Sequence, residues 1–215
     1  FDLDGTLYSQ RCIRRRMLWE LGLHCLRHPS ELTSLQVIAE FRRARERLAD
    51  EGVVGIRDLQ YRRPASKLGI APEQVAEVIR EWIEERPLRH LRRCRSTAVE
   101  ELFEALRESG KSIAIFSDYP VEATVGVLGL VPDFIAAADD PEIDCLKPHT
   151  AGLDYLMSRS GFTPEQSLMI GDREDRDGAC ARRAGMRYLI KTPSARAPHH
   201  FRGFQELLPG LVGVK

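Results

Sequence analysis

The sequence has little of several features that mark particular classes of protein. It carries no net charge at pH 7 and only 7% aromatic residues, and because no basic stretch is interleaved with aromatics we expect no nucleic-acid partner. No apolar run approaches the roughly 20 residues that span a bilayer, so we expect no membrane segment. A basic stretch followed by an apolar one, as in a secretory signal, is also missing. We therefore expect a cytoplasmic protein, and the start at Phe1 rather than Met leads us to expect further residues upstream.

Cysteines are few and are not spaced as metal ligands. None of the five forms a CxxC pair, which argues against a disulfide framework and against a structural zinc site. We expect reduced, mostly buried thiols at Cys12, Cys25, Cys94, Cys145 and Cys180.

The chain of 215 residues is long enough for one large domain that carries an insertion. After residue 95, a predicted helix at 97–109 is followed by short apolar segments that alternate with helical stretches, which is typical of a parallel sheet with helices on both faces. Strands are predicted at 112–116, 134–137, 167–171 and 187–190, and Phe1 to Leu3 has the character of the end of another buried strand. The fold class is therefore α/β, a Rossmann-like doubly wound parallel sheet.

Residues 11–95 have a helical pattern and no strand. Apolar residues recur at spacings of three and four between Leu35 and Leu48, with Ser30 as a candidate N-cap, and a second helix is predicted from Pro72 to about Glu85. Trp19 and Trp82 are expected to be packing residues. We therefore expect an all-helical domain, residues 11–95, inserted into a core made of residues 1–10 and 96–215.

This insertion is basic, with 18 arginines and one lysine against 12 acidic residues, a net charge of +7. One interpretation is that the arginines lie on solvated helix faces, as at Arg42, Arg43, Arg45 and Arg47. The other is a basic lid over an anionic ligand. One or more arginines near its start, from among Arg14, Arg15 and Arg16, would then bind a second anionic or hydroxylated part of the ligand.

Polar residues follow the predicted strands at their carboxyl ends. They form four clusters: Asp2 to Thr6, Ser117 with Asp118, Lys147 with Pro148, and Gly171 through Asp177. In a parallel α/β sheet these ends converge on one crevice. The carboxylates gathered there repel one another and need a cation, and a small set of carboxylate oxygens suits Mg²⁺.

These clusters, read in order as FDLDGTL, FSD, LKP and GDREDRDGACARRAG, resemble the four motifs of the haloacid dehalogenase superfamily. The helical insertion after the first motif resembles the cap of one branch, which contains phosphoglycolate phosphatase and β-phosphoglucomutase. The resemblance implies a magnesium-dependent phosphatase that hydrolyses a small-molecule phosphate monoester through an aspartyl-phosphate.

The resemblance also implies a role for each residue. Asp2 would be the nucleophile and Asp4 the general acid and base, while Lys147 would offset the charge of phosphate and nucleophile. The substrate would be bound by Thr6, Ser117, Asp118 and Lys147, with Thr6 and Ser117 donating to the phosphoryl oxygens. Mg²⁺ would be held by Asp2, Asp4 through its carbonyl, Asp172 and Asp177. Asp4 favours phosphoryl transfer over cleavage of a carbon–halogen bond, because dehalogenating members lack this second aspartate. We expect Lys147→Ala to affect turnover far more than stability.

Several alternatives remain open on the sequence alone. Asp177 fits the GDxxxxD form of the last motif best, whereas Asp175 is either the second acidic residue of that motif or a helix N-cap, and Glu174 is expected in solvent. His199 and His200 are interpreted as a loop pair in preference to a metal site. A phosphomutase of the same fold, or a catalytically silent binding module, are the functional alternatives.

Overall fold

The protein is described from a computed structural model, which covers residues 1–27, 33–194 and 196–212. The candidate N-cap Ser30 lies outside the described residues. Among those described, none of the helices combines the length and the apolar character that a membrane crossing requires.

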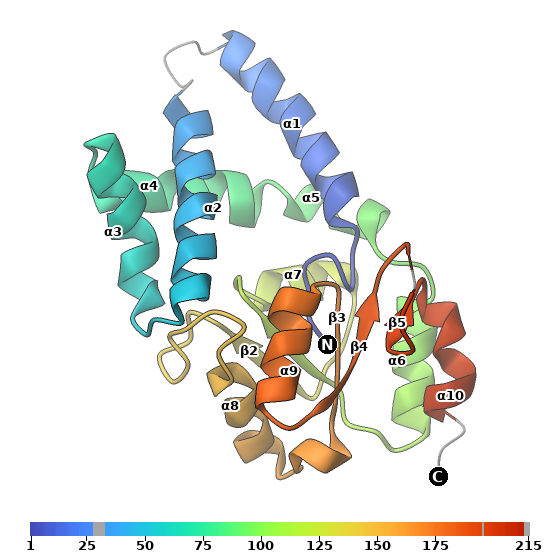
Figure 1. The fold of residues 1–215 in the computed structure, drawn as a ribbon. Coiled ribbons are helices and arrows are strands. Elements are labelled where there is room, and N and C mark those ends of the chain that lie inside the picture. The colour runs from blue at the N-terminus through green and yellow to red at the C-terminus, as the bar shows by residue number, and fades with distance from the viewer. Residues whose placement is uncertain (28–32, 195, 213–215) are drawn as a thin grey trace.

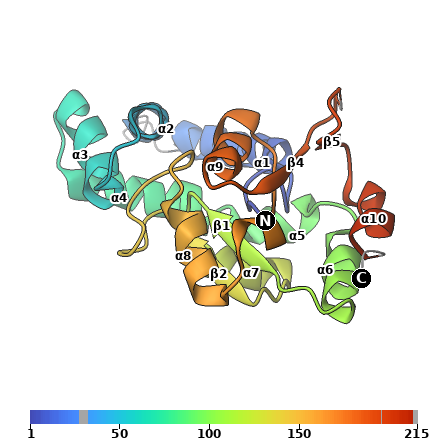
Figure 2. The same ribbon diagram turned by 60° about the horizontal axis from the view of Figure 1, so that its bottom comes forward.

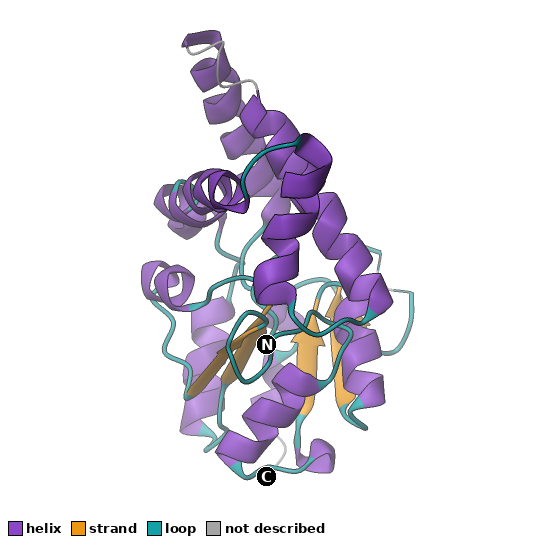
Figure 3. Ribbon diagram, turned by 90° about the vertical axis from the view of Figure 1, so that its left-hand side faces the viewer, coloured by secondary structure: helices purple, strands orange, loops and turns teal. Residues whose placement is uncertain are grey.

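The first half of the chain is helical, as predicted. Its helices are α1 (Gln10–Arg27), α2 (Thr33–Glu51), α3 (Ile56–Leu68), α4 (Pro72–Ile79), which continues as a π-helical segment Arg80–Glu85, and α5 (Leu88–Cys94). Figures 1 and 3 show this helical part on one side of the molecule, with all the strands on the other.

The apolar spacing predicts α2 well but does not show which of its apolar side chains are buried. Phe41 and Leu48 are buried, whereas Leu35 is 41% exposed. Trp82 is buried as predicted, but the packing role predicted for Trp19 is wrong, because its side chain is 73% exposed. The reason is that α1 projects away from the body of the protein along much of its length (Figure 1).

The second half alternates strands and helices. Its elements are α6 (Val99–Glu108), β1 (Ala114–Ser117), α7 (Glu122–Leu128), β2 (Phe134–Ala137), α8 (Ala151–Ser160), β3 (Leu168–Gly171), α9 (Ala179–Arg183), β4 (Arg187–Lys191), β5 (His200–Phe201) and α10 (Leu208–Val212), with short helical turns at Pro164–Gln166, Glu174–Gly178 and Phe204–Glu206. All four predicted strands are confirmed, and β5 is an addition. Figure 2 shows α6 and α10 side by side at the edge beyond β5.

The first residues of the chain join two groups of parallel strands. β1 pairs with β2, and β3 pairs with β4, which pairs with β5, all in parallel. The N–H of Phe116 donates to the carbonyl of Phe1 at 2.9 Å, and the N–H of Asp2 donates to the carbonyl of Ile170 at 2.8 Å. The start of the chain therefore occupies the strand position between β1 and β3, so that Asp2 emerges in the middle of the edge where the parallel strands end.

The helical part is seated on this edge through two buried apolar clusters. Leu48 and Ile56 of the helical part pack with Phe116 and Ile143, and Ile13 and Leu91 join the cluster around Leu7 and Val125. A third cluster around Phe41 and Trp82 belongs to the helical part itself. The predicted division into residues 11–95 and residues 1–10 with 96–215 stays a prediction.

The expectation that all cysteines are reduced is wrong for two of them. Cys12, near the start of α1, and Cys94, at the end of α5, form a disulfide across 82 residues of sequence. The two crossings between the helical part and the sheet lie side by side there, since the N–H of Ser9 donates to the carbonyl of Cys94 at 2.8 Å, a proximity that sequence spacing does not reveal. Cys145 and Cys180 are buried free thiols, as predicted, and the side chain of Cys25 lies outside the described part.

Candidate active site

Asp2 lies at the centre of the site, with a residue exposure of only 4%. Its two carboxylate oxygens have different partners. Thr6 Oγ1 donates to Oδ2 at 2.9 Å, and Lys147 Nζ donates to Oδ1. Thr6 is therefore held on Asp2, within the same turn, and the oxygens of Asp2 face a hydroxyl on one side and an ammonium on the other.

Gly5 allows the turn after Asp2 to approach Asp172 closely. Its φ of +97° is in the region that favours glycine, and a Cβ there would lie 2.1 Å from Asp172 Oδ2. Lys191 at the end of β4 supports the same turn, since its Nζ donates to the carbonyl of Thr6 at 2.7 Å. The sequence gives no sign of this role, because Lys191 comes near the turn only through the pairing of β4 with β3.

Asp4 lies beside Asp2 and contacts two hydroxyl groups. Ser117 Oγ donates to Asp4 Oδ2 at 3.1 Å, and the hydroxyl of Tyr8, a residue that the motifs do not single out, donates to Oδ1. Burial raises the pKa of Asp4, although these hydrogen bonds oppose it. A carboxyl group with a raised pKa is suited to carry a proton to a leaving group.

Lys147 is 2% exposed and lies between two carboxylates. Its Nζ is 2.7 Å from Asp177 Oδ1 and also donates to Asp2. Burial alone would lower the pKa of Lys147, but Asp177 and Asp2 outweigh it and hold that pKa well above its usual value. The ammonium is therefore charged and compensates two buried carboxylates.

Asp177 organises the loop after β3. Its Oδ2 accepts the backbone N–H groups of Asp172 at 3.1 Å and Arg173 at 3.0 Å. By contrast, the side chain of Asp175 is 64% exposed and pairs with Arg173 at 2.7 Å. Of the two alternatives for the last motif, Asp177 is thus the one that faces the site.

Three carboxylates form a group in which a cation fits. Ligand oxygens of Asp2, Asp172 and Asp177 all lie within 4.8 Å of one another. Burial, and then the charge of Asp177, raise the pKa of Asp172 to about 6 and that of Asp2 well above its usual value. A donor set of hard oxygens with unfavourable mutual repulsion suits Mg²⁺. Lys147 supplies one positive charge to this group.

Asp118 positions the lysine. Its Oδ1 accepts the backbone N–H of Lys147 at 3.2 Å, and its own carbonyl accepts a hydrogen bond from Arg45 of α2. Arg45 is 6% exposed, and its guanidinium lies 4.3 Å from the ring centroid of Tyr119. The solvated-face interpretation is therefore wrong for Arg45, which links the helical part to the segment after β1.

A cavity of about 270 Å³ lies between the helical part and the strand ends. Its floor includes Asp2, Asp4 and Asp172, and its helical wall includes Arg14 and Arg42. Of the three arginines proposed near the start of the insertion, Arg14 lines the cavity, whereas Arg15 and Arg16 are not part of its lining.

Ion pairs connect α2, which contributes to the helical wall of the cavity, to the loop after β3. Arg173 and Arg176 each lie 2.7 Å from Glu46 of α2, and Arg176 lies 2.7 Å from Asp50. These contacts connect α2 with the segment between Asp172 and Asp177.

Four ordered motifs at the ends of parallel strands, below a helical insertion, restrict the possible families, and the comparison with known families decides among them. The model described as haloacid dehalogenase-like hydrolase matches residues 1–185. The chain belongs to this family. Its α/β Rossmann-like fold with a helical cap, predicted from the sequence, is confirmed.

Similar proteins in this family include phosphatases and dehalogenases. A phosphoglycolate phosphatase of Haemophilus influenzae is 32% identical over 80 residues, which make up 36% of this chain and 36% of that enzyme. The HAD hydrolase YfnB from Bacillus subtilis, solved with magnesium bound, superposes with a TM-score of 0.65 at 18% identity, covering 100% of this chain and 97% of that one. A 2-haloacid dehalogenase from Pseudomonas syringae pv. tomato gives a TM-score of 0.60 at 19% identity, covering 99% and 96%. At these identities the two solved structures show a shared fold.

Proposed function

We propose that this family member is a magnesium-dependent phosphatase that hydrolyses a small-molecule phosphate monoester through an aspartyl-phosphate on Asp2. The observation that carries the proposal is Asp4, a second carboxyl two residues after Asp2, hydrogen-bonded to Ser117 and with its pKa raised by burial. Hydrolysis of a phosphate ester needs a proton for the leaving alcohol. Displacement of a halide ion needs none, so Asp4 favours the phosphatase over the dehalogenase activity named for several structural neighbours.

The reaction has two displacements at phosphorus. An oxygen of Asp2 attacks the phosphorus, the bond to the ester oxygen breaks, and Asp4 gives its proton to the leaving alcohol. Water then attacks the phosphorus of the aspartyl-phosphate, Asp4 takes a proton from that water, and the bond to Asp2 breaks to release inorganic phosphate.

Charge and hydrogen bonds in the site support phosphoryl transfer. Lys147, with Asp118 behind its backbone, would offset negative charge on the phosphoryl oxygens. Ser117 and Thr6 would donate to those oxygens once a substrate displaces their present contacts with Asp4 and Asp2. Mg²⁺, held by Asp2, Asp172, Asp177 and the carbonyl of Asp4, would supply Lewis-acid stabilisation of the same oxygens.

The helical insertion would act as the lid and set the substrate class. The small cavity suits a small molecule, and Arg14 and Arg42 in its wall favour one with a second anionic group beside the phosphate. We expect Arg14→Ala to raise KM for such a substrate without raising it for a plain aryl phosphate. Arg15→Ala is the matched control, and unchanged substrate preference in Arg14→Ala would remove this part of the proposal.

The first test measures release of phosphate from an aryl phosphate by the wild type and by Asp2→Asn, with and without Mg²⁺. Release of chloride from 2-chloropropionate is measured in parallel as the test for a dehalogenase. Magnesium-dependent phosphate release that Asp2→Asn abolishes supports the proposal. Chloride release without phosphate release would replace it by a dehalogenase. Activity that depends on a sugar bisphosphate and releases little free phosphate would indicate a phosphomutase. No turnover across a panel of phosphate esters would indicate a silent binding module.

We also propose a cytoplasmic location, and this part is tested separately because the Cys12–Cys94 disulfide counts against it. A reducing compartment would open the bond between Cys12 and Cys94. Thiol alkylation in freshly lysed cells therefore distinguishes the cytoplasm, where both would be labelled, from an oxidising compartment, where both would be protected.

A further inference from the structure

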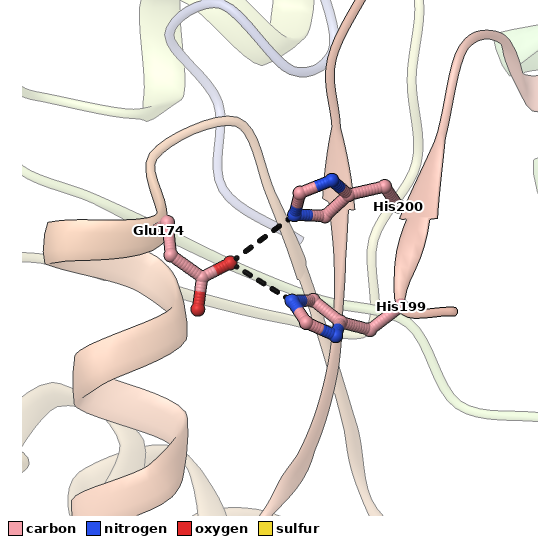
Figure 4. A group of neighbouring side chains, drawn as sticks. All are labelled: Glu174, His199 and His200. Carbon is pink, nitrogen blue, oxygen red and sulfur yellow. Dashed lines mark hydrogen bonds and ion pairs between the residues drawn. The ribbon is translucent and has the colours of Figure 1, made fainter. Parts of the chain in front are cut away.

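A second group of possible metal ligands includes a residue of the loop after β3 and two histidines near β5. It consists of Glu174, which begins the helical turn after Asp172, of His199, which directly precedes β5, and of His200, the first residue of β5. Figure 4 shows both imidazole rings pointing toward the carboxylate of Glu174 from the neighbouring strand. Twenty-five residues of sequence separate Glu174 from His199, so only the parallel pairing of β3, β4 and β5 brings the three together.

We propose that these three side chains bind a transition-metal cation of the Zn²⁺ class, independently of the proposed phosphatase site. The Nε2 atoms of His199 and His200 lie 3.1 and 3.5 Å from the same carboxylate oxygen, Glu174 Oε2. Ligand atoms of a tetrahedral zinc site, with bonds of about 2.0–2.1 Å, lie about 3.3 Å from one another. The two distances lie on either side of this value.

The surroundings of the cluster prepare the carboxylate for this role. The hydroxyl of Tyr188 donates to Glu174 Oε1 at 2.8 Å, and Arg182 pairs with the same oxygen, which leaves Oε2 directed at the histidines. His200 is also held at its other nitrogen, where Nδ1 accepts the N–H of Arg196 at a long 3.4 Å. This weak bond would be given up, because coordination through Nε2 leaves the proton on Nδ1.

The chemistry of the donors separates this site from the acidic one. Two imidazoles with one carboxylate suit zinc, nickel or copper, whereas Mg²⁺ prefers oxygen ligands. The side chains of His199 and His200 are 34% and 20% exposed, so a cation can enter from solvent and complete its coordination with water. A bound cation would fasten the loop that carries Asp172 and Asp177 to β5.

The test is a titration of untagged full-length protein with ZnCl₂ in excess Mg²⁺, followed by calorimetry and thermal unfolding. We expect one Zn²⁺ per wild-type chain, and an unfolding temperature raised by about 5–10 °C when free Zn²⁺ is one hundred times Kd. His199→Ala with His200→Ala should abolish both effects. His90→Ala, which removes a histidine that also faces a carboxylate, Glu20, is the matched control and should keep both.

Two further variants protect the test against a folding defect and against binding at the acidic site. Glu174→Gln keeps the shape of its side chain and should weaken Zn²⁺ binding about tenfold or more, while Asp172→Asn should leave it unchanged. The proposal is overturned if the wild type binds no Zn²⁺ in excess Mg²⁺, if the double histidine variant binds as the wild type does, or if Asp172→Asn abolishes the binding. In those outcomes the cluster is an ion pair between histidines and Glu174.

Discussion

Replacement of Lys147 by methionine removes the ammonium but keeps most of the side-chain stem. In the wild type the ammonium compensates Asp2 and Asp177, whose residue exposures are 4% and 2%. Removing one partner of a buried ion pair typically costs 3–5 kcal/mol, because a charge is left buried and uncompensated. We therefore expect Lys147→Met to lower the free energy of unfolding by roughly 3–5 kcal/mol at pH 8, and the unfolding temperature by roughly 6–20 °C.

The loss of stability in Lys147→Met should depend on pH, because the carboxyl of Asp2 can take up a proton. Without the ammonium, the pKa of Asp2 rises further in the folded protein. A carboxyl with a raised folded pKa contributes stability that is present below its unfolded pKa and is lost as the pH rises through the folded value. The deficit of the variant relative to wild type should therefore be large at pH 8 and smaller at pH 4.5, where protonation replaces the missing cation.

The assay is urea unfolding without Mg²⁺, followed by circular dichroism at both pH values. Lys67→Met is the matched control and should change stability by no more than about 1 kcal/mol, because Lys67 is 57% exposed and its partner Glu40 keeps Arg43. In an Asp177→Asn background the cost of Lys147→Met should shrink. Equal stability of Lys147→Met and wild type at pH 8, or the same deficit at both pH values, would refute the reasoning.

Three further predictions concern other parts of the site and the fold. Asp4→Asn should lower kcat about 10²–10⁴-fold for an alkyl phosphate and less for an aryl phosphate, whose leaving group needs no proton; equal losses would contradict the acid role. Because the pKa of Asp172 is raised to about 6 by burial and Asp177, its contribution to stability is lost as the pH rises through 6, by on the order of 3 kcal/mol. The rise in unfolding temperature on adding Mg²⁺ should therefore grow from pH 5 to pH 7, and Asp172→Asn should flatten that growth. Cys12→Ser should lower stability by about 2–4 kcal/mol in oxidising buffer, and a reductant should bring the wild type down to the variant; urea unfolding with and without dithiothreitol measures both.

Local patterns were enough to predict the fold and to locate the acidic site. Apolar segments of four or five residues between helical stretches located β1 to β4, and parallel strands place their carboxyl ends together. Asp2 lies on the first residues of the chain between β1 and β3, Lys147 lies between β2 and α8, and Asp177 lies in the turn after β3. These segments converge at the same edge of the strands, where side chains separated by up to 145 residues meet. The fold prediction depended on the succession of strands and helices along the chain and not on side-chain conformation, and the roles of the site residues stay predictions.

Features that depend on contacts between distant segments could not be predicted. The spacing of cysteines gives no sign that Cys12 and Cys94 are neighbours, and helical periodicity identifies α1 without showing that Trp19 is exposed. The burial of Lys147 is of the same kind, since the LKP motif indicates a catalytic lysine but not that its charge also holds the fold together. From the sequence we therefore expected a replacement of Lys147 to affect turnover far more than stability, whereas the structure predicts a substantial loss of stability as well.

The Cys12–Cys94 bond has a mechanical consequence for the lid. The two chain crossings are joined at this point by the disulfide and by the hydrogen bond from Ser9 to Cys94. An opening of the proposed lid that breaks the ion pairs of Glu46 would therefore rotate about this point. Arg27 lies about 22 Å along α1 from Cys12, so a rotation of about 10° displaces it by about 4 Å, whereas Arg14, about 3 Å from the pivot, moves by less than about 1 Å. One wall of the cavity would thus stay fixed on the substrate while the other swings, and the end of α1 farthest from the strands is the place where a fluorescent label would report the motion best.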